Sequence, residues 1–131
     1  ALETFGTPLL GGDTIAAAGP RAIGLTAIGR ATHTPVPARS GARAGDGVWM
    51  TGPVGRAMLG FEGHPDHREA FNRPRPRLAE GQALAPHVTA MMDVSDGLLL
   101  DAFRMAEASG MTLALESAAI KRLRRGKWWR A

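Results

Sequence analysis

The sequence contains no cysteine among its 131 residues, which excludes a disulfide scaffold, a thiol nucleophile and a cysteine-ligated metal site. Tyrosine is also absent, and aromatic residues make up 5% of the chain, so few side chains could stack on nucleic-acid bases. No apolar run approaches the ~20 residues that cross a bilayer, and residues 1–10 show no signal-peptide pattern. The remaining composition, 44% hydrophobic and 21% charged, is typical of one globular domain.

Lysine is missing from the first 120 residues, which hold ten arginines against twelve acidic residues. The formal net charge of +4 therefore comes from the last eleven residues, which carry six cations and no acid: Lys121, Arg122, Arg124, Arg125, Lys127 and Arg130. Because the body of the chain is mildly acidic, we expect no nucleic-acid partner for the chain as a whole. Residues 120–131 are either a solvated end or a basic tail that docks on an anionic surface.

Apolar periodicity and turn residues predict three strands and three helices. The strands are expected at residues 22–31, 48–51 and 111–115. The helices are expected at residues 54–61, 78–91 and 98–109, and residues 63–76 are expected to form a proline-rich loop. In the last helix the apolar residues form one stripe that we expect to be buried, and Gly110 is suited to end it. This order of elements predicts an α/β or α+β fold.

The motif Gly11-Gly12-Asp13-Thr14 has the residue types of a phosphate-binding turn. Two glycines let the backbone approach a phosphate closely, and a neighbouring carboxylate is a ligand that Mg²⁺ accepts. The same four residues are also compatible with an ordinary tight turn in which Asp13 caps the backbone. The motif by itself leaves both interpretations open.

A second motif, Asp93-Val94-Ser95-Asp96-Gly97, precedes the helix expected at residues 98–109. Ser95 or Asp96 could cap the free N–H groups of that helix. Asp93 follows an apolar-leaning segment, and a carboxylate buried there would need the compensation that a metal ion supplies. Two carboxylates beside a helix N-terminus are therefore compatible with an Mg²⁺–phosphate site as well as with capping.

The segment at residues 39–46 (Arg-Ser-Gly-Ala-Arg-Ala-Gly-Asp) offers guanidinium groups of the kind that bind phosphate oxygens. Taken alone, Arg39 and Arg43 are better explained as solvated side chains that pair with surface acids.

Taken together and in this order, the three motifs resemble thiamine-monophosphate kinase, a member of the ATP-binding superfamily related to aminoimidazole ribonucleotide synthetase (the PurM-like fold). The resemblance runs from about residue 9 to about residue 119 and includes Leu25-Thr26, the Thr51-Gly52 turn and residues 74–81. It implies a cytoplasmic enzyme of thiamine biosynthesis that uses ATP and Mg²⁺ to phosphorylate thiamine monophosphate to thiamine diphosphate. It also implies a homodimer in the full-length family and no membrane partner.

Residue by residue, the resemblance implies that Gly12, Asp13, Arg39 and Ser95 contact ATP and that Asp13, Asp93 and Asp96 bind the metal. It identifies no catalytic residue and no contact to thiamine phosphate in this sequence. Phosphoryl transfer depends on positioning and charge neutralisation rather than on a protein nucleophile, so acids and an arginine are suitable residue types.

The resemblance also implies a domain organisation. Residues 1–38 would be the end of an N-terminal ATP-binding α/β domain, residues 39–119 the start of a C-terminal α/β domain, and residues 120–131 a tail unlike the family. Because family members extend further at both ends, we expect a partial enzyme with negligible activity of its own. Two alternatives remain: another ATP-using member of the superfamily, similar to selenophosphate synthetase, or a non-catalytic module with an anion-binding basic tail. The Arg-Ser-Gly-Ala segment and Ser95 favour the thiamine branch.

Overall fold

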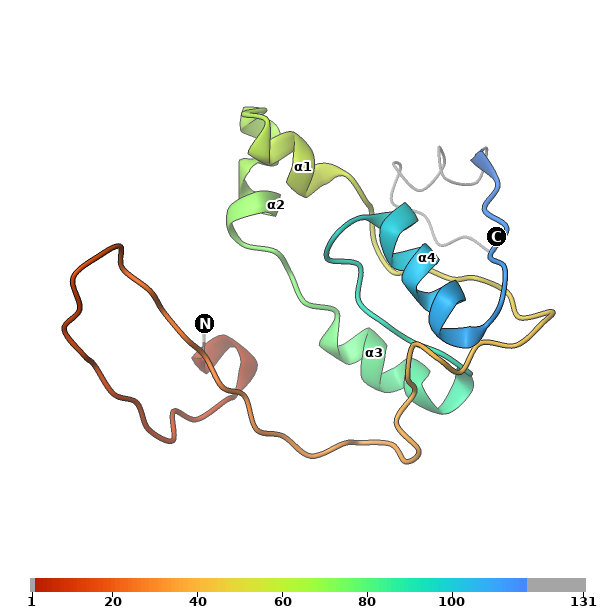
Figure 1. Cartoon of the computed structure of the whole chain (residues 1–131), viewed down its shortest axis with the longest axis horizontal. Coiled ribbons are helices and arrows are strands. Elements are labelled where there is room, and N and C mark those ends of the chain that lie inside the picture. Colours follow the sequence, from red (N-terminus) through yellow and green to blue (C-terminus); the bar gives the residue numbers. More distant parts are fainter. Residues whose placement is uncertain (1, 118–131) are drawn as a thin grey trace.

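The computed structural model describes residues 2–117, and its regular structure there is helical (Figure 1). The four α-helices are α1 (Arg56–Phe61), α2 (Arg68–Asn72), α3 (Leu78–Leu84) and α4 (Leu98–Ser109). Three single-turn 3₁₀-helices accompany them: η1 (Glu3–Phe5), η2 (Pro65–His67) and η3 (Ala85–His87). The helices expected at residues 54–61 and 98–109 are thereby confirmed, and the basic tail at residues 120–131 lies outside the described residues.

The three expected strands are not found: in the described part of the chain residues 22–31 and 111–115 form no strand, and of residues 48–51 only Trp49 makes an isolated bridge. A strand is completed by hydrogen bonds to a neighbouring strand, and a local pattern of apolar residues does not supply that neighbour. Within residues 2–117 the chain is partly helical, and the α/β or α+β class is not confirmed there.

Helices α1 and α2 pack against each other as a short pair, although residues 63–76 were expected to form only a loop. Gly60 of α1 is buried, and a Cβ atom there would lie 2.3 Å from the carbonyl oxygen of His67 and 2.9 Å from the Cβ atom of Phe71. The rings of Phe61 and Phe71 meet with their centroids 5.4 Å apart, within the usual range for an aromatic pair. The absence of a side chain at Gly60 therefore permits the close crossing.

Helix α3 ends earlier than expected because of a proline. The sequence predicts one helix over residues 78–91, but α3 stops at Leu84 and continues only as the 3₁₀ turn η3, which contains Pro86. Proline has no N–H group to donate to the fourth residue before it, and its ring clashes with that residue's carbonyl. The chain then continues from Val88, which is extended, through a bend at Thr89 toward the 93–97 turn.

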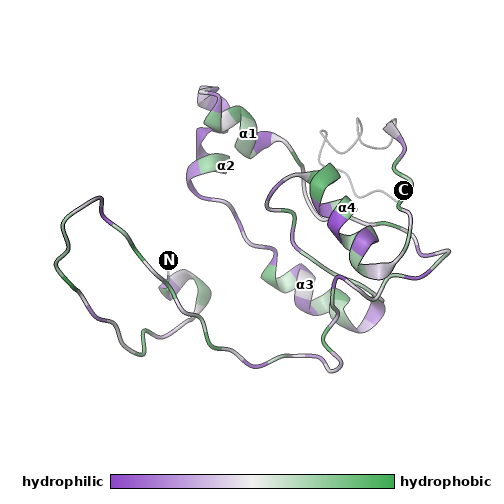
Figure 2. Ribbon diagram, in the orientation of Figure 1, coloured by the Kyte–Doolittle hydropathy of each residue, from purple (hydrophilic) through white to green (hydrophobic). Residues whose placement is uncertain are grey.

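Helix α4 begins after Gly97 and ends at Gly110, whose left-handed conformation (φ 61°) is the expected helix stop. Its apolar stripe is only partly covered: Ala106 is 8% exposed, whereas Leu99 and Phe103 are 69% and 60% exposed. Figure 2 shows the hydrophobic residues gathered at the start of this helix. The prediction that the whole stripe is buried is therefore wrong for the described structure.

Residues 2–32 are exposed throughout, and Figure 1 shows them, in red and orange, looping away from α1–α4. The most deeply buried hydrophobic residues of the described part are Ala85 and Ala106, each 8% exposed. No helix in the described part is both long enough and apolar enough to cross a membrane. With so little enclosed apolar surface, polar contacts and close backbone packing hold the predicted site segments in place.

Candidate functional site: two segments tied to helix α4

The 93–97 turn is held by a carboxylate from inside the helix that follows it. Oδ2 of Asp101 accepts hydrogen bonds from the backbone N–H groups of Asp96 (3.0 Å) and Gly97 (3.1 Å). No side-chain cap is found at Gly97, so neither Ser95 nor Asp96 performs the capping role that the sequence allows them. Asp101, in the first turn of α4, instead accepts the N–H groups of the two residues just before the helix, and so ties the 93–97 turn to it.

An arginine one turn further along α4 completes this cluster. Nη1 of Arg104 donates a hydrogen bond to Oδ1 of Asp101 at 3.0 Å and forms a second, close ion pair with Oδ2 of Asp96. The side chain of Asp101 is 2% exposed, while those of Arg104 and Asp96 are 38% and 50% exposed. Asp101 therefore has a hydrogen-bond donor on each of its two oxygens, as a buried carboxylate requires.

The electrostatics of the cluster follow from these contacts. Burial raises the pKa of Asp101, but the N–H group of Asp96, the Arg104 guanidinium and the N–H group of Gly97 outweigh it, so that the pKa lies below the ordinary value. The pKa of Arg104 is raised, chiefly by its hydrogen bond to Asp96. Asp101 and Arg104 are thus a charged pair at neutral pH.

Asp101 and Arg104, the two residues of α4 that hold this turn, were not predicted from the motifs. The one signal available was an acid in the first turn of an expected helix with an arginine three residues later, a spacing at which side chains meet. Asp93, by contrast, is exposed, so the argument that a buried Asp93 needs a metal ion does not hold in the described structure.

The 39–46 segment is tied to the other end of α4. Oγ of Ser109 donates a hydrogen bond to the carbonyl oxygen of Arg39 at 2.9 Å and accepts one from the N–H group of Ala42 at 3.2 Å. The N–H group of Met91 donates to the carbonyl oxygen of Ala38 at 3.2 Å. These bonds fix the backbone at Arg39 and leave its side chain exposed to solvent.

Asp46 closes the same segment with two hydrogen bonds. Its Oδ2 accepts from the hydroxyl group of Thr89 at 2.5 Å and from the N–H group of Arg43 at 2.8 Å. The Thr89 hydroxyl, followed by the Arg43 N–H group, lowers the pKa of Asp46 despite some opposing desolvation. These contacts link residues 43–46 to the chain after η3.

Replacing Thr89 by valine is expected to raise the pKa of Asp46 toward its ordinary value, because valine keeps the shape of threonine and removes the donor. A carboxyl pKa that folding lowers stabilises the folded state above the unfolded pKa of about 3.9. That stabilisation is lost as the pH falls through the folded pKa. In the Thr89→Val variant the stabilisation is smaller, so the loss of stability at acid pH is smaller too. An NMR titration of the Asp46 carboxyl carbon measures the shift. Thr112→Val, at an exposed threonine, is the matched control, and equal Asp46 titrations in Thr89→Val and the parent chain would contradict the assignment.

The Gly11–Asp13 motif does not lie with the other two. Gly12 and Asp13 are on the exposed stretch at residues 2–32, where the Asp13 carboxylate accepts a hydrogen bond from the N–H group of Thr14 at 2.7 Å. This contact joins neighbouring residues only, and the structure has no turn at residues 11–14. The described structure therefore brings the 39–46 and 93–97 segments onto α4, whereas the stretch at residues 2–32, to which Asp13 belongs, loops away from α1–α4 (Figure 1).

The acids of the described residues do not fit a magnesium ion as they stand. No group of three or more histidine, aspartate or glutamate side chains in this part of the chain lies close enough together to hold a metal. Asp96 is paired with Arg104, and both oxygens of Asp101 accept hydrogen bonds. Of the three acids at residues 93–101, Asp93 is the one that is exposed and has no hydrogen bond or ion pair of its side chain among the described residues.

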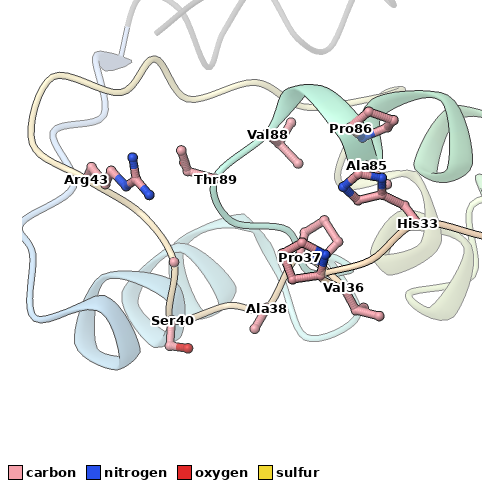
Figure 3. Close-up of a pocket in the computed structure, with 12 residues that line it drawn as sticks. His33, Val36, Pro37, Ala38, Ser40, Arg43, Ala85, Pro86, Val88 and Thr89 are labelled. Atoms are coloured by element: carbon pink, nitrogen blue, oxygen red, sulfur yellow. The ribbon is translucent and has the colours of Figure 1, made fainter. Parts of the chain in front are cut away.

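A cavity of about 310 Å³ lies beside the 39–46 segment, between residues 33–43 and residues 85–89. Figure 3 shows Pro37, Val36 and Ala85 on one side of it and Arg43 and Thr89 on the other. Its lining includes Ser40 and Arg43 from the predicted nucleotide segment, but neither Arg39 nor any residue of the 93–97 turn. The cavity is thus formed in part by the 39–46 segment, but not by Arg39, Ser95 or the acids that the sequence predicts as ligands.

Comparison with known proteins finds thiamine-monophosphate kinases. The chain is 32% identical over 120 residues to the enzyme of Caulobacter vibrioides, 40% over 102 residues to that of Halobacterium salinarum and 37% over 124 residues to that of Mycobacterium tuberculosis. These matches cover 86%, 75% and 88% of this chain, and 34%, 35% and 37% of the relatives. No family model matches the sequence.

The resemblance drawn from the three motifs is thereby confirmed. The chain spans about a third of the length of the curated relatives that it matches. By sequence, the chain is similar to about a third of a thiamine-monophosphate kinase.

Proposed function

We propose that this chain carries nucleotide-binding segments of a thiamine-monophosphate kinase, an enzyme that transfers the γ-phosphoryl group of ATP to thiamine monophosphate. The observation that carries the proposal is the 32–40% identity to three such kinases over most of this chain. The order of the three motifs along the sequence supports the same function. As a second candidate, a related superfamily activity such as that of selenophosphate synthetase would use the same nucleotide segments on another substrate.

Helix α4 supports this proposal by acting as a common frame. Ser109 near its end holds the backbone of Arg39, and Asp101 near its start holds the 93–97 turn. Phosphoryl transfer gains most of its rate from positioning and charge neutralisation, so a shared rigid element is what two phosphate-facing segments need. In the proposed roles, Arg39 pairs with phosphate oxygens, and Ser95 donates a hydrogen bond to them.

The remaining proposed roles are those of the glycine turn and the acids. Gly12 lets the backbone approach a phosphate, and Asp13, Asp93 and Asp96 would hold the magnesium ion, which neutralises phosphate charge when bound. Asp96 can bind the magnesium ion only when Arg104 releases it. Asp13 can join it only when residues 2–32 lie against the 93–97 turn. We propose these as properties of the assembled enzyme, with the cytoplasm as its location, a homodimer as its form and residues 1–38 and 39–119 as parts of two domains.

A chimera tests the function. Residues 9–117 replace the aligned segment of the Halobacterium salinarum kinase, and thiamine diphosphate formation from ATP and thiamine monophosphate is measured. We expect activity in the chimera, negligible activity in the 131-residue chain, and a loss of about 100-fold in the chimera with Asp93→Asn, the scale of removing one charge-stabilising group. Glu107→Gln is the control. A chimera that melts cooperatively yet forms no product would refute the proposal, and product formation with selenide in place of thiamine monophosphate would favour the second candidate.

A further inference from the structure

The cavity beside the 39–46 segment has a wall that is largely apolar. Seven of its 12 lining residues are proline, valine or alanine. Its volume of about 310 Å³ falls at the lower end of the range for small-molecule sites, about 300–1,000 Å³, and such sites combine an apolar wall with a few polar groups that orient the ligand. The shape and lining of this cavity therefore suit a small organic molecule.

The two walls of the cavity are held to each other by polar contacts. The N–H group of Met91 donates to the carbonyl oxygen of Ala38 at 3.2 Å. The hydroxyl group of Thr89 donates to the carboxylate of Asp46 at 2.5 Å. These bonds join residues 38–46 to residues 89–91, so the walls are positioned before a ligand arrives. Binding then has less chain to order, which favours affinity.

The charged groups of the lining are cationic or neutral. Figure 3 shows Arg43 at one end of the cavity and the half-buried His33 at the other. The lining contains no aspartate or glutamate. Asp46 lies next to Arg43 in the fold, but its Oδ2 atom accepts the hydroxyl group of Thr89 and the backbone N–H group of Arg43, and not the guanidinium group.

The guanidinium group of Arg43 is thus available to a ligand. Its side chain forms no hydrogen bond or ion pair among the described residues. Guanidinium groups bind carboxylate and phosphate oxygens with two parallel hydrogen bonds. An apolar wall with such a group at one end matches a molecule that has an apolar body and one anionic group.

We infer that this cavity is a binding site for a small organic anion, in which Arg43 pairs with a carboxylate or phosphate group and the apolar wall covers the body of the ligand. The inference goes beyond the proposed function, since none of the residues predicted to contact ATP or magnesium lines the cavity. A neutral molecule of the same shape loses the ion pair, and inorganic phosphate loses the apolar contact.

The test titrates the 131-residue chain with benzoate and with phenyl phosphate. NMR follows the backbone amides of Gly41 and Thr89 and the ring of His33, which surround the cavity. We expect saturable shifts of these signals with both probes. Benzyl alcohol, which has the ring without the charge, and inorganic phosphate should each bind roughly tenfold more weakly, the scale of one hydrogen bond to a charged group.

Two variants separate charge from packing. Arg43→Gln should weaken benzoate binding roughly tenfold and leave benzyl alcohol unchanged, and it keeps the backbone N–H group that Asp46 accepts. Ala38→Phe places a ring in the cavity from an exposed position and should abolish binding of both probes. Arg56→Gln is the matched control, because Arg56 is exposed at the start of α1 and does not line the cavity.

Three results would overturn the inference. The first is the absence of saturable shifts around the cavity in the parent chain. The second is equal benzoate affinity in the parent chain and in Arg43→Gln, which decides by itself if Ala38→Phe does not fold. The third is displacement of benzoate by ATP, which would make the cavity part of a nucleotide site. Because no arm measures thiamine diphosphate, a chimera that forms no product leaves this inference standing.

Discussion

Replacing Gly41 by alanine is expected to separate the 39–46 segment from the backbone at Thr89. A Cβ atom at position 41 would lie 2.0 Å from the carbonyl oxygen of Thr89 and 3.1 Å from its carbonyl carbon. Both are backbone atoms, which cannot rotate away as the end of a flexible side chain can. We expect the free energy of unfolding to fall by about 2–3 kcal/mol, the upper part of the range for overpacking.

Two measurements check the Gly41 prediction. Chemical unfolding followed by circular dichroism gives the change in stability, and hydrogen exchange at the Met91 amide reports the bond to Ala38 that the displaced segment should lose. Gly29→Ala is the control, because position 29 has open space around it and no left-handed backbone. It should change the stability by less than about 0.5 kcal/mol. If Gly41→Ala and Gly29→Ala unfold alike, the close packing at Thr89 is not present in solution.

Asp101→Ala is expected to release the 93–97 turn from helix α4. The substitution removes the acceptor of the Asp96 and Gly97 N–H groups and leaves Arg104 paired with Asp96 alone. Exchange of these two amides should quicken about tenfold, which corresponds to one ordinary hydrogen bond. Asp101→Asn keeps one acceptor oxygen and loses the charge. The exchange rates of the two amides in this variant should therefore lie between those of the parent chain and those of the alanine variant.

Glu107→Ala is the control for Asp101→Ala, since it removes an exposed acid from the same helix. The pH dependence gives a second readout. Because the folded pKa of Asp101 is lowered, its contribution to stability is present above the unfolded pKa of about 3.9 and fades as the pH falls below it. The Asp101→Ala variant should lack this acid-dependent loss. Equal exchange of the Asp96 and Gly97 amides in the parent chain and in Asp101→Ala would contradict the role given to this carboxylate.

Helix α4 shows how far local sequence information reaches. Its apolar repeat, the glycine before it and the glycine after it predict its bounds at 98–109, and the structure has the same bounds. Helix α1 was placed within two residues for similar reasons. Such signals work because a helix closes its hydrogen bonds within one stretch of chain.

Elements that depend on a distant partner were not predictable in the same way. Residues 22–31 have a strand-like composition, but a strand needs a neighbouring strand, which the described residues do not offer. Helix α2 was missed because its five residues carry too little periodicity, and it packs against α1 through Gly60 and Phe71. The end of α3 at Pro86, in contrast, depends on a local effect of proline and can be predicted from the sequence alone.

The candidate site likewise has features that local sequence predicts and features that depend on residues distant in the sequence. The sequence by itself determined the similarity to thiamine-monophosphate kinases, through three motifs whose residue types suit phosphate and magnesium. Only the tertiary structure decided that Asp101 holds the 93–97 turn, that Ser109 holds the backbone of Arg39, and that Arg104 neutralises Asp96. The physical reason is that a motif specifies which donors and acceptors are present, whereas their pairing depends on which atoms folding brings within hydrogen-bond distance.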